Sequence, residues 1–429
     1  MKHLCKAILT AALCALPWSV YADDVLSFRG ENRQGRYDAD DVLKSWPEGG
    51  LEPVWVYDGL GAGWGSPAVV SRRVFINGTD PSDPTMETLT HLGRKGEVIW
   101  QVKTGPVWAK SHSSARSTPT VVPGAARGEG LIYVHTGGGT LLCVAEKDGK
   151  VLWRQDVSGT YEGRPGNWGY AESPVVVDDK VFVCPGGRKA SMVAFHRLSG
   201  KVIWEAEPMG DSSSYAAPVQ WKDQLIQVSG KNVFGVDIRN GAIRWKMPAF
   251  AEGSKGRNDI NCNNVLLEDN RVLVISGYND PALMFEIAPN GNSAKMVWTN
   301  EILDPHHGGA VLVDGKIYSS TWLNNSSGTW ACVDWATGKT LYDTPWDNLG
   351  KGSIIALDDD LLIMYEEKRG TVALARPNPA KLDIISSFQF RLGAKEHWSH
   401  PVVSSGRLYI RRGNVLAMYD IRDKSKDKD

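Results

Sequence analysis

Short runs of alternating apolar and polar residues follow one another along most of the chain, and each run ends in a polar turn. The recurring unit is a small residue, often followed by proline, then a Val-rich strand, a turn and a second strand. Alternation with period two, bounded by turn residues, predicts β-strands, and regular recurrence predicts a repeat fold. The unit starts at eight positions: Ser66, Thr118, Ser173, Ala217, Asn263, Gly309, Gly352 and His400.

Each of the first seven units is followed by a strand pair that ends in an aromatic residue. Most of these pairs turn at a glycine, as hairpins that need a positive φ usually do. The closing aromatic residues recur every 41 to 53 residues: Trp100, Trp153, Trp204, Trp245, Trp298, Tyr342 and Phe388. This spacing is typical of a four-stranded propeller blade, and we expect the closing rings to pack between neighbouring blades.

The eighth unit reaches the end of the chain before a fourth strand can form. Residues 51–57, LEPVWVY, precede the first unit and offer the missing strand. Pairing them with the last blade would close the ring and leave no open sheet edge. We therefore predict an all-β, eight-bladed β-propeller of four-stranded blades, a single domain over residues 23–420. Residues 421–429 are highly charged, and we expect a disordered tail there.

Residues 1–22 have the features of a secretory signal peptide. Lys2 and Lys6 precede an apolar run, and the small residues Val20 and Ala22 precede the expected cleavage position. Cys14 follows a leucine, where a lipoprotein signal needs a small residue, so we expect no lipid anchor. No other run approaches the roughly 18 apolar residues of a transmembrane helix. The sequence therefore predicts a periplasmic or secreted protein without a transmembrane segment.

Composition narrows the classes of function. The 429 residues carry 48 basic and 49 acidic side chains, a net charge of −1, which excludes a strongly basic nucleic-acid binder. No nucleophile-elbow, P-loop or dinucleotide-binding motif is present, and no CxxC zinc or CxxCH haem motif. Four cysteines follow the predicted signal peptide, far apart in sequence, and we expect buried free thiols: Cys143, Cys184, Cys262 and Cys332.

Candidate site residues gather in the loops that precede the Val-rich strands, which we call the leading loops. In a propeller the first strand of each blade lines the axis, so these loops form a funnel on one face. Aromatic rings among charges of both signs suit a small polar or saccharide-like ligand, although the same rings could serve packing alone. The predicted ligand-binding residues are Trp64, His112, Arg116, Trp168, Tyr215, Asn261, Lys351, His397, Trp398 and His400.

The sequence leaves catalysis open. A histidine with a pKa near neutrality and a desolvated carboxyl group could act as base and acid in a carbohydrate-active hydrolase or lyase. The candidates are His306, His307, Glu172 and Tyr170. Structural roles are the alternative: the two histidines could bond main-chain carbonyls in a tight loop, and Glu172 could bond a neighbouring loop.

The runs DGKVLW (148–153) and SGKVIW (199–204) resemble the pyrroloquinoline quinone (PQQ) repeat. That family includes quinoprotein alcohol dehydrogenases, the outer-membrane assembly lipoprotein BamB, and many exported bacterial proteins of unassigned role. FRGENRQGRYD at residues 28–38 is similar to the N-terminal segment of this last group. The resemblance covers nearly the whole chain and implies the propeller fold, but one propeller fold hosts unrelated functions.

The resemblance implies two further functions. Quinoprotein dehydrogenases have two adjacent, disulfide-bonded cysteines above the quinone, a Ca²⁺ held by Glu, Asn and Asp, and an Asp base. This sequence has no adjacent cysteines, so PQQ with Ca²⁺ is disfavoured, and we predict no cofactor and no metal. A non-enzymatic assembly scaffold of the BamB type, with a protein partner, remains an alternative.

Overall fold

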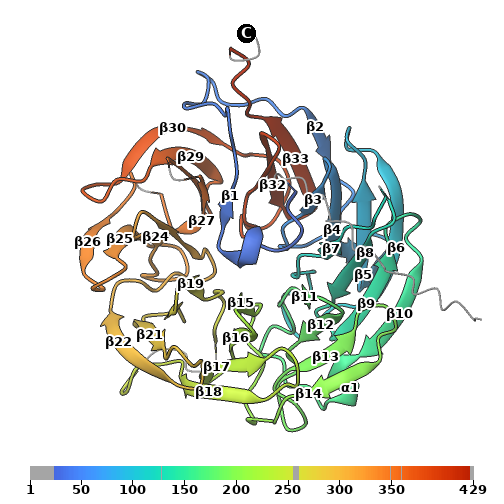
Figure 1. The fold of residues 1–429 in the computed structure, drawn as a ribbon. Coiled ribbons are helices and arrows are strands. Elements are labelled where there is room, and N and C mark those ends of the chain that lie inside the picture. The colour runs from blue at the N-terminus through green and yellow to red at the C-terminus, as the bar shows by residue number, and fades with distance from the viewer. Residues whose placement is uncertain (1–23, 127, 255–259, 348, 359, 426–429) are drawn as a thin grey trace, which may run out of the picture.

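The computed structural model describes residues 24–126, 128–254, 260–347, 349–358 and 360–425. Within these ranges the strands form eight sheets arranged around a central axis (Figure 1). Each sheet contains an antiparallel meander of four strands, with the first strand at the axis and the fourth at the rim. The predicted all-β, eight-bladed propeller is confirmed.

The first four blades follow the chain without interruption. Blade 1 holds β3 (Ala68–Val70), β4 (Arg73–Asp80), β5 (Asp83–Leu92) and β6 (Val98–Pro106), and blade 2 holds β7 (Thr120–Val122), β8 (Leu131–His135), β9 (Thr140–Ala145) and β10 (Val151–Asp156). A short helix, α1 (Val157–Thr160), follows β10. Blade 3 holds β11 (Val175–Val177), β12 (Lys180–Val183), β13 (Val193–His196) and β14 (Val202–Glu205), and blade 4 holds β15 (Val219–Trp221), β16 (Gln224–Val228), β17 (Asn232–Asp237) and β18 (Ile243–Pro248).

The other four blades complete the ring. Blade 5 holds β19 (Leu266–Glu268), β20 (Arg271–Val274), β21 (Ala282–Ile287) and β22 (Ala294–Asn300), and blade 6 holds β23 (Ala310–Val313), β24 (Lys316–Ser320), β25 (Trp330–Asp334) and β26 (Thr340–Thr344). Blade 7 holds β27 (Gly352–Leu357), β28 (Leu361–Glu366), β29 (Thr371–Arg376) and β30 (Asp383–Gln389). Blade 8 holds β31 (Val402–Ser404), β32 (Arg407–Arg412), β33 (Val415–Asp420) and the early strand β2 (Trp55–Tyr57).

Ring closure follows the prediction. β2 pairs antiparallel with β33, with Trp55 opposite Met418 and Tyr57 opposite Leu416. The chain stays bonded to the body just beyond β33, where the Ile421 amide donates to the Gly406 carbonyl at 3.0 Å. The predicted signal peptide and residues 426–429 of the predicted tail lie outside the described residues. Among the described helices, none is long and apolar enough to cross a membrane.

The apolar core lies between neighbouring sheets, and the closing tryptophans seal it through a repeated contact. Four of the five indoles cover the hairpin glycine of the next blade, where an added Cβ would lie 2.5 to 2.8 Å from the ring. The same four indole N–H groups also donate to a main-chain oxygen before that hairpin: Trp100 to Glu146 (3.0 Å), Trp153 to Arg197 (2.9 Å), Trp204 to Ile238 (3.0 Å) and Trp298 to Trp335 (3.1 Å).

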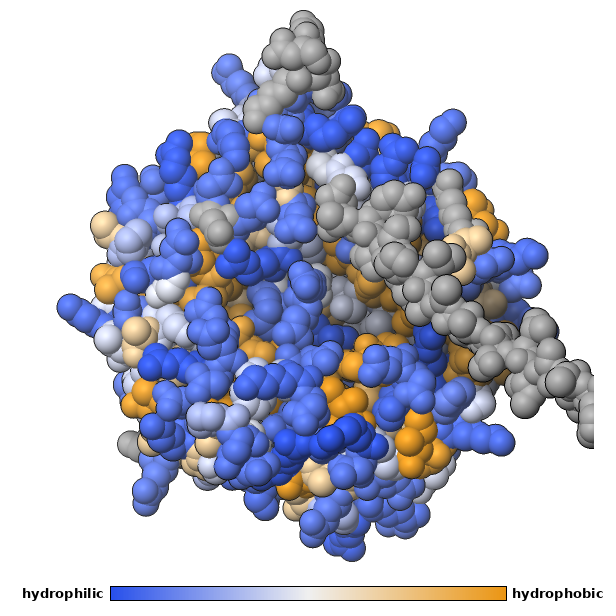
Figure 2. All heavy atoms as spheres, viewed as in Figure 1, coloured by the Kyte–Doolittle hydropathy of each residue, from blue (hydrophilic) through white to orange (hydrophobic). Residues whose placement is uncertain are grey.

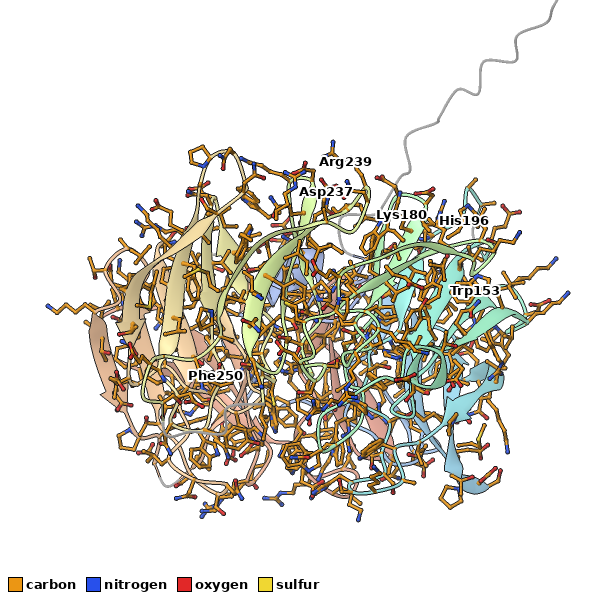
Figure 3. All side chains as sticks on the ribbon, turned by 90° about the horizontal axis from the view of Figure 1, so that it is seen from below. Trp153, Lys180, His196, Asp237, Arg239 and Phe250 are labelled. Carbon is orange, nitrogen blue, oxygen red and sulfur yellow. The ribbon has the colours of Figure 1, made fainter. Side chains whose placement is uncertain are left out.

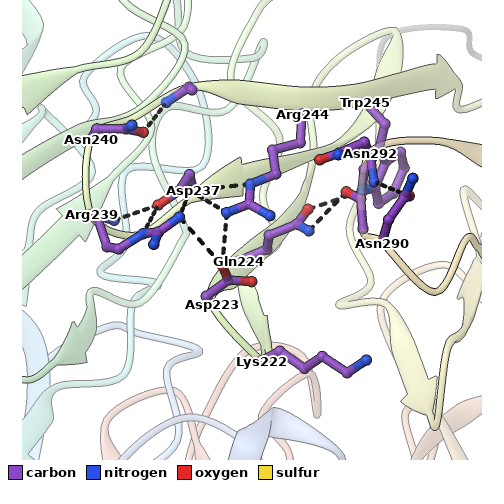
Figure 4. Close-up of polar contacts among 12 residues, drawn as sticks. Lys222, Asp223, Gln224, Asp237, Arg239, Asn240, Arg244, Trp245, Asn290 and Asn292 are labelled. Atoms are coloured by element: carbon purple, nitrogen blue, oxygen red, sulfur yellow. Dashed lines mark hydrogen bonds and ion pairs between the residues drawn. The ribbon is translucent and has the colours of Figure 1, made fainter.

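The junction of blades 4 and 5 departs from this pattern (Figure 4). Trp245 donates to Gln224 Oε1 of its own blade at 3.0 Å, and Gln224 Nε2 reaches the Gly291 carbonyl of blade 5 at 2.9 Å. Beside it, Asp237 accepts hydrogen bonds from Arg239 at 2.7 Å and from Arg244 Nε at 3.1 Å. These hydrogen bonds, chiefly those from Arg239, hold the pKa of the Asp237 carboxyl well below its usual range.

An N-terminal segment, residues 24–37, crosses the axis, and we call it the axial plug (Figure 1). It contains a 3-10 turn, η1 (Glu31–Arg33), and β1 (Arg36–Tyr37), which pairs in parallel with β27 of blade 7. The plug bonds blades 1 to 4 through Val25 to Val69 (2.8 Å), Leu26 to Val121 (2.8 Å), Arg33 to Pro174 (3.2 Å) and Asn32 to Gln220 (3.1 Å).

The plug also reaches the remaining blades. It bonds blades 5 to 8 through Gln34 to Leu267 (2.9 Å), Arg36 to Leu312 (2.8 Å), Gly35 to Ala356 (2.9 Å) and Arg29 to His400 (2.8 Å). One short segment therefore bonds all eight blades near the axis, where the inner strands would otherwise present an open row of unpaired backbone groups.

Each meander alternates its connections between two faces. The leading loops and the connections between second and third strands, which we call the mid-blade loops, lie at one face, and the remaining hairpins lie at the other. In Figure 3, Lys180, His196, Asp237 and Arg239 mark the hairpin face, while Phe250, in the segment between β18 and β19, lies toward the opposite one. The face seen in Figure 1 is covered mostly by hydrophilic residues (Figure 2).

Candidate functional site

A cavity of about 470 Å³ lies on the leading-loop side of the axis. Its wall includes residues from the leading loops of blades 1 to 6 and 8, far apart in sequence. Nine predicted site residues line it: Trp64, His112, Arg116, Trp168, Tyr215, His306, His307, Trp398 and His400.

Aromatic rings form the main surface of the wall, with Trp398 at their centre. Its ring centroid lies 5.0 Å from that of Trp64, 5.1 Å from that of His307 and 6.2 Å from that of His112. The Arg116 guanidinium lies 5.2 Å from the centre of the Trp64 ring, within the range of a cation–π contact. Flat apolar surfaces and cationic or polar groups therefore alternate around one space.

Several wall residues were not among the predicted site residues. Tyr278, Asn325 and Glu367 belong to the mid-blade loops of blades 5, 6 and 7, and Phe28 belongs to the axial plug. Cys262 and Glu396 belong to leading loops. The meander topology could have identified these loops from the sequence, because in a four-stranded blade the mid-blade loops lie at the same end as the leading loops.

His306 and His307 have different surroundings. The Tyr278 hydroxyl and His306 Nε2 form a hydrogen bond, and both rings line the cavity. Neither ring nitrogen of His307 has a hydrogen-bond partner among the described residues, although its Nε2 lies 3.7 Å from Glu367 Oε2. Burial, with smaller contributions from neighbouring groups, lowers the pKa of His307 well below its usual range, so this imidazole is neutral.

His400 is fixed in one tautomer. Arg29 of the plug donates from Nη1 to His400 Nδ1 at 2.8 Å, so the proton of the ring must lie on Nε2. Nε2 in turn donates to the His307 carbonyl at 2.8 Å. Burial lowers the pKa of His400 to about 3. This histidine is therefore a neutral structural link between plug and wall rather than a base.

The other five predicted residues do not line the cavity, and their polar atoms bond mid-blade loops or, for His397, strand β28. Glu172, 1% exposed, accepts from the Cys184 amide at 2.5 Å, and burial raises its pKa to about 8. The predicted catalytic roles of Glu172 and Tyr170 gain no support from these positions. The other bonds run from Tyr170 to Pro185 (2.9 Å), Asn261 to Ser229 (2.7 Å), Lys351 to Asn325 (2.9 Å) and between His397 and Tyr365 (2.6 Å).

The cavity wall lacks the pair of adjacent cysteines that the resemblance implies for dehydrogenases. The wall carries a single cysteine, Cys262, and all four described cysteines are free, three of them buried. Over the described ranges, no three His, Cys, Asp or Glu side chains are arranged to hold a metal ion. That the protein binds no cofactor stays a prediction.

Comparison with known proteins agrees with the fold. The structure is similar to BamB from Moraxella catarrhalis (13% identity, 86% of this chain and 99% of that one, TM-score 0.61) and to a europium-containing methanol dehydrogenase (12% identity, 91% and 89%, TM-score 0.64). It is also similar to the quinohemoprotein alcohol dehydrogenase from Comamonas testosteroni (12% identity, 93% and 80%, TM-score 0.59). No curated protein sequence matches the chain.

At these identities the structural likeness shows the fold alone. The sequence match is more specific, since residues 85–344, more than half of the chain, match the PQQ-repeat family described as "Outer membrane protein assembly factor BamB". The chain therefore belongs to this PQQ-repeat family of β-propellers.

Proposed function

We propose that this protein is exported and binds a small saccharide-like ligand in the cavity on its axis. The observation that carries the proposal is the wall itself, where Trp64, Trp398 and Tyr278 lie among imidazoles and charged groups around about 470 Å³. This volume lies within the usual range for small-molecule sites. Aromatic faces can cover the C–H faces of a sugar ring, and the polar groups between them can bond its hydroxyls.

Three residues that line the cavity carry buried polar atoms without a partner, and these atoms suit a hydroxyl-rich ligand toward which their side chains turn on binding. Trp64 Nε1, both ring nitrogens of His307 and Glu396 Oε2 are buried without a hydrogen-bond partner among the described residues. An unsatisfied buried polar group costs about 1–3 kcal/mol. A hydroxyl can both donate and accept, so one type of ligand group matches the indole donor, the carboxylate acceptor and the neutral imidazole.

The charges of the wall disfavour a strongly charged ligand. The lining includes Arg116 together with Glu396 and Glu367, and Glu367 is paired with Lys351. Arg116 donates to the main-chain oxygens of Trp168 and His112. A neutral ligand avoids the repulsion that a polyanion would meet from the carboxylates and a polycation from the guanidinium.

A thermal-shift screen with mono- and oligosaccharides tests the proposal. A ligand at 100 times its Kd should add about 2.7 kcal/mol to the free energy of unfolding and raise the melting temperature visibly. Trp398→Ala should abolish the shift, whereas Met296→Ala should keep it, because Met296 is 55% exposed and lies in β22 at the rim. No shift with any saccharide would contradict the proposal.

The hydrogen bond between Tyr278 and His306 favours a second candidate, a carbohydrate-active hydrolase or lyase. Both groups line the cavity and could exchange a proton with a bound sugar. In that case His306→Ala abolishes turnover of a bound saccharide while binding persists. Turnover that survives this substitution would exclude His306 as the acid–base group.

The description of the matched family supports an assembly scaffold as a third candidate. A scaffold would need a protein partner, and its binding would not depend on the cavity. A purified partner that binds wild type and Trp398→Ala equally well would distinguish the scaffold from the two candidates that use the cavity.

The proposal that the protein is exported rests on the signal-peptide features of residues 1–22 and on the same family description. Fractionation of the native cells and sequencing of the purified N-terminus test it. The expected mature chain begins directly after Ala22, and a cytoplasmic chain that keeps Met1 would contradict export.

A further inference from the structure

The floor of the cavity belongs to the axial plug rather than to any blade. Phe28 is the plug residue on the wall, half-buried and aimed at the cavity, and its ring meets the His400 ring edge-on at 5.1 Å between centroids. The next residues of the plug lie on the far side of this floor, where Asn32, Gln34 and Arg36 line a separate hydrophilic hollow. Phe28 therefore separates two spaces along the axis.

The plug is held firmly enough to act as a floor. Arg29 is 3% exposed and donates from Nη1 to the Ile354 carbonyl at 3.1 Å and from Nη2 to the Ala310 carbonyl at 2.5 Å. Asn32 exchanges two hydrogen bonds with the Gln220 main chain, at 3.1 and 3.0 Å. Together with the contacts to the other blades, these bonds fix the height of Phe28 along the axis.

We propose that Phe28 is a specificity-determining residue and that the blind-ended cavity takes the end of a saccharide chain, or a free short saccharide, rather than an internal segment of a polymer. This inference rests on the proposed function. An internal segment must enter and leave a site, which requires a groove open at both ends. The plug closes one end of the axis, so a ligand that reaches Phe28 must terminate there.

The experiment places a thiol on the floor of the full mature chain. Phe28→Cys and, as a matched control, Val25→Cys are made in a Cys262→Ser background, which leaves only the three buried described cysteines. Val25 is a plug residue that is 3% exposed, packs in the apolar core and borders the hydrophilic hollow instead of the cavity. We expect a small methanethiosulfonate reagent to modify the thiol of Phe28→Cys at least about tenfold faster than that of Val25→Cys, because reaction requires an accessible thiol. Circular dichroism checks that both variants fold.

The ligand part of the test uses soluble glucans, galactans and mannans, each intact and partially hydrolysed. At equal mass a hydrolysate contains more chain ends, so it should slow modification of the floor thiol in Phe28→Cys several-fold more than the intact polymer. Equal slowing by both forms would overturn recognition of chain ends. A floor thiol that reacts as slowly as the thiol of Val25→Cys would overturn Phe28 as the floor. If no saccharide slows a rapidly modified floor thiol, the proposed function fails although the floor is correctly assigned.

Substitutions of the native residue give a second readout. Phe28→Ala lengthens the cavity toward the plug and should raise the affinity for a saccharide one unit longer than the best wild-type ligand. Phe28→Trp shortens the cavity and should weaken binding of that ligand about tenfold or more. Unchanged length preference in both variants would also overturn the inference.

Discussion

The contact between a closing tryptophan and the hairpin glycine of the next blade predicts the stability of a single variant, Gly241→Ala. Gly241 lies in the β17–β18 hairpin at a φ of +78°, beneath the indole of Trp204 from blade 3. An added Cβ would lie 2.5 Å from Trp204 Cε3. Trp204 cannot simply move away, because it is 8% exposed and its N–H donates to the Ile238 carbonyl at 3.0 Å.

Two costs add at this position. Alanine in the left-handed region costs about 1–2 kcal/mol, and an extra methyl group in a packed core costs about 1–3 kcal/mol. The variant should therefore lose about 2–5 kcal/mol of unfolding free energy. Gly315→Ala is the matched control, since Gly315 has a φ of +68° in the β23–β24 hairpin and a Cβ added there would meet no atom within 4 Å. Only the backbone cost of about 1–2 kcal/mol applies to this control.

Guanidinium denaturation followed by circular dichroism compares the unfolding midpoints of both variants with that of wild type. The comparison requires that the unfolding free energy falls with denaturant concentration at the same slope in all three proteins. Gly241→Ala should unfold at clearly lower denaturant than Gly315→Ala. Equal midpoints for the two variants would refute the claim that the tryptophan–glycine contact constrains the junction between blades.

Two further predictions concern buried polar groups. Burial raises the pKa of Glu172 from 4.5 to about 8, so the folded protein keeps a proton that the unfolded chain releases, and the unfolding free energy falls as pH rises through this window. Glu172→Gln removes this pH dependence, so its unfolding free energy should rise relative to that of wild type as the pH increases from 4.5 to about 8. A difference that stays constant across this pH range would contradict the assignment. Arg29→Met removes the donor of the Ile354 and Ala310 carbonyls, at a cost of about 1–3 kcal/mol for each unsatisfied group. The variant should therefore speed amide hydrogen exchange in residues 24–37, whereas the control Arg391→Met, at an exposed position, should not. Unchanged exchange would show that Arg29 does not hold the plug.

The repeat pattern was sufficient to predict the fold because each blade is encoded locally. The Val-rich strands, the hairpin glycines and the closing tryptophans all lie within one unit, and the strand at Trp55–Tyr57 is a fourth strand of the same type. The axial plug was not predicted, because its residues contact positions as far as 371 residues away in sequence, as Arg29 contacts His400. Its polar, aperiodic sequence contains no signal for these partners.

The site was predicted in part for the same reason. The position of the leading loops follows from the repeat, so Trp64, Arg116 and Trp398 were found. Which side chains of a loop face the axis depends on contacts between loops, as where Glu172 turns to the Cys184 amide. Sequence spacing does not encode that choice, and the mid-blade residues Tyr278 and Glu367 were missed because only the leading loops were considered.

Alkylation of Cys262 tests the central claim, that the axial cavity is a ligand site, most directly. Cys262 lines the cavity and is half-buried, whereas Cys143, Cys184 and Cys332 are buried. Mass spectrometry would follow its modification by iodoacetamide with and without each saccharide that stabilises the protein. We predict that such a saccharide slows the modification of Cys262 in wild type and leaves its rate unchanged in Trp398→Ala. A stabilising saccharide that leaves Cys262 equally reactive in wild type would place the ligand elsewhere and contradict the account.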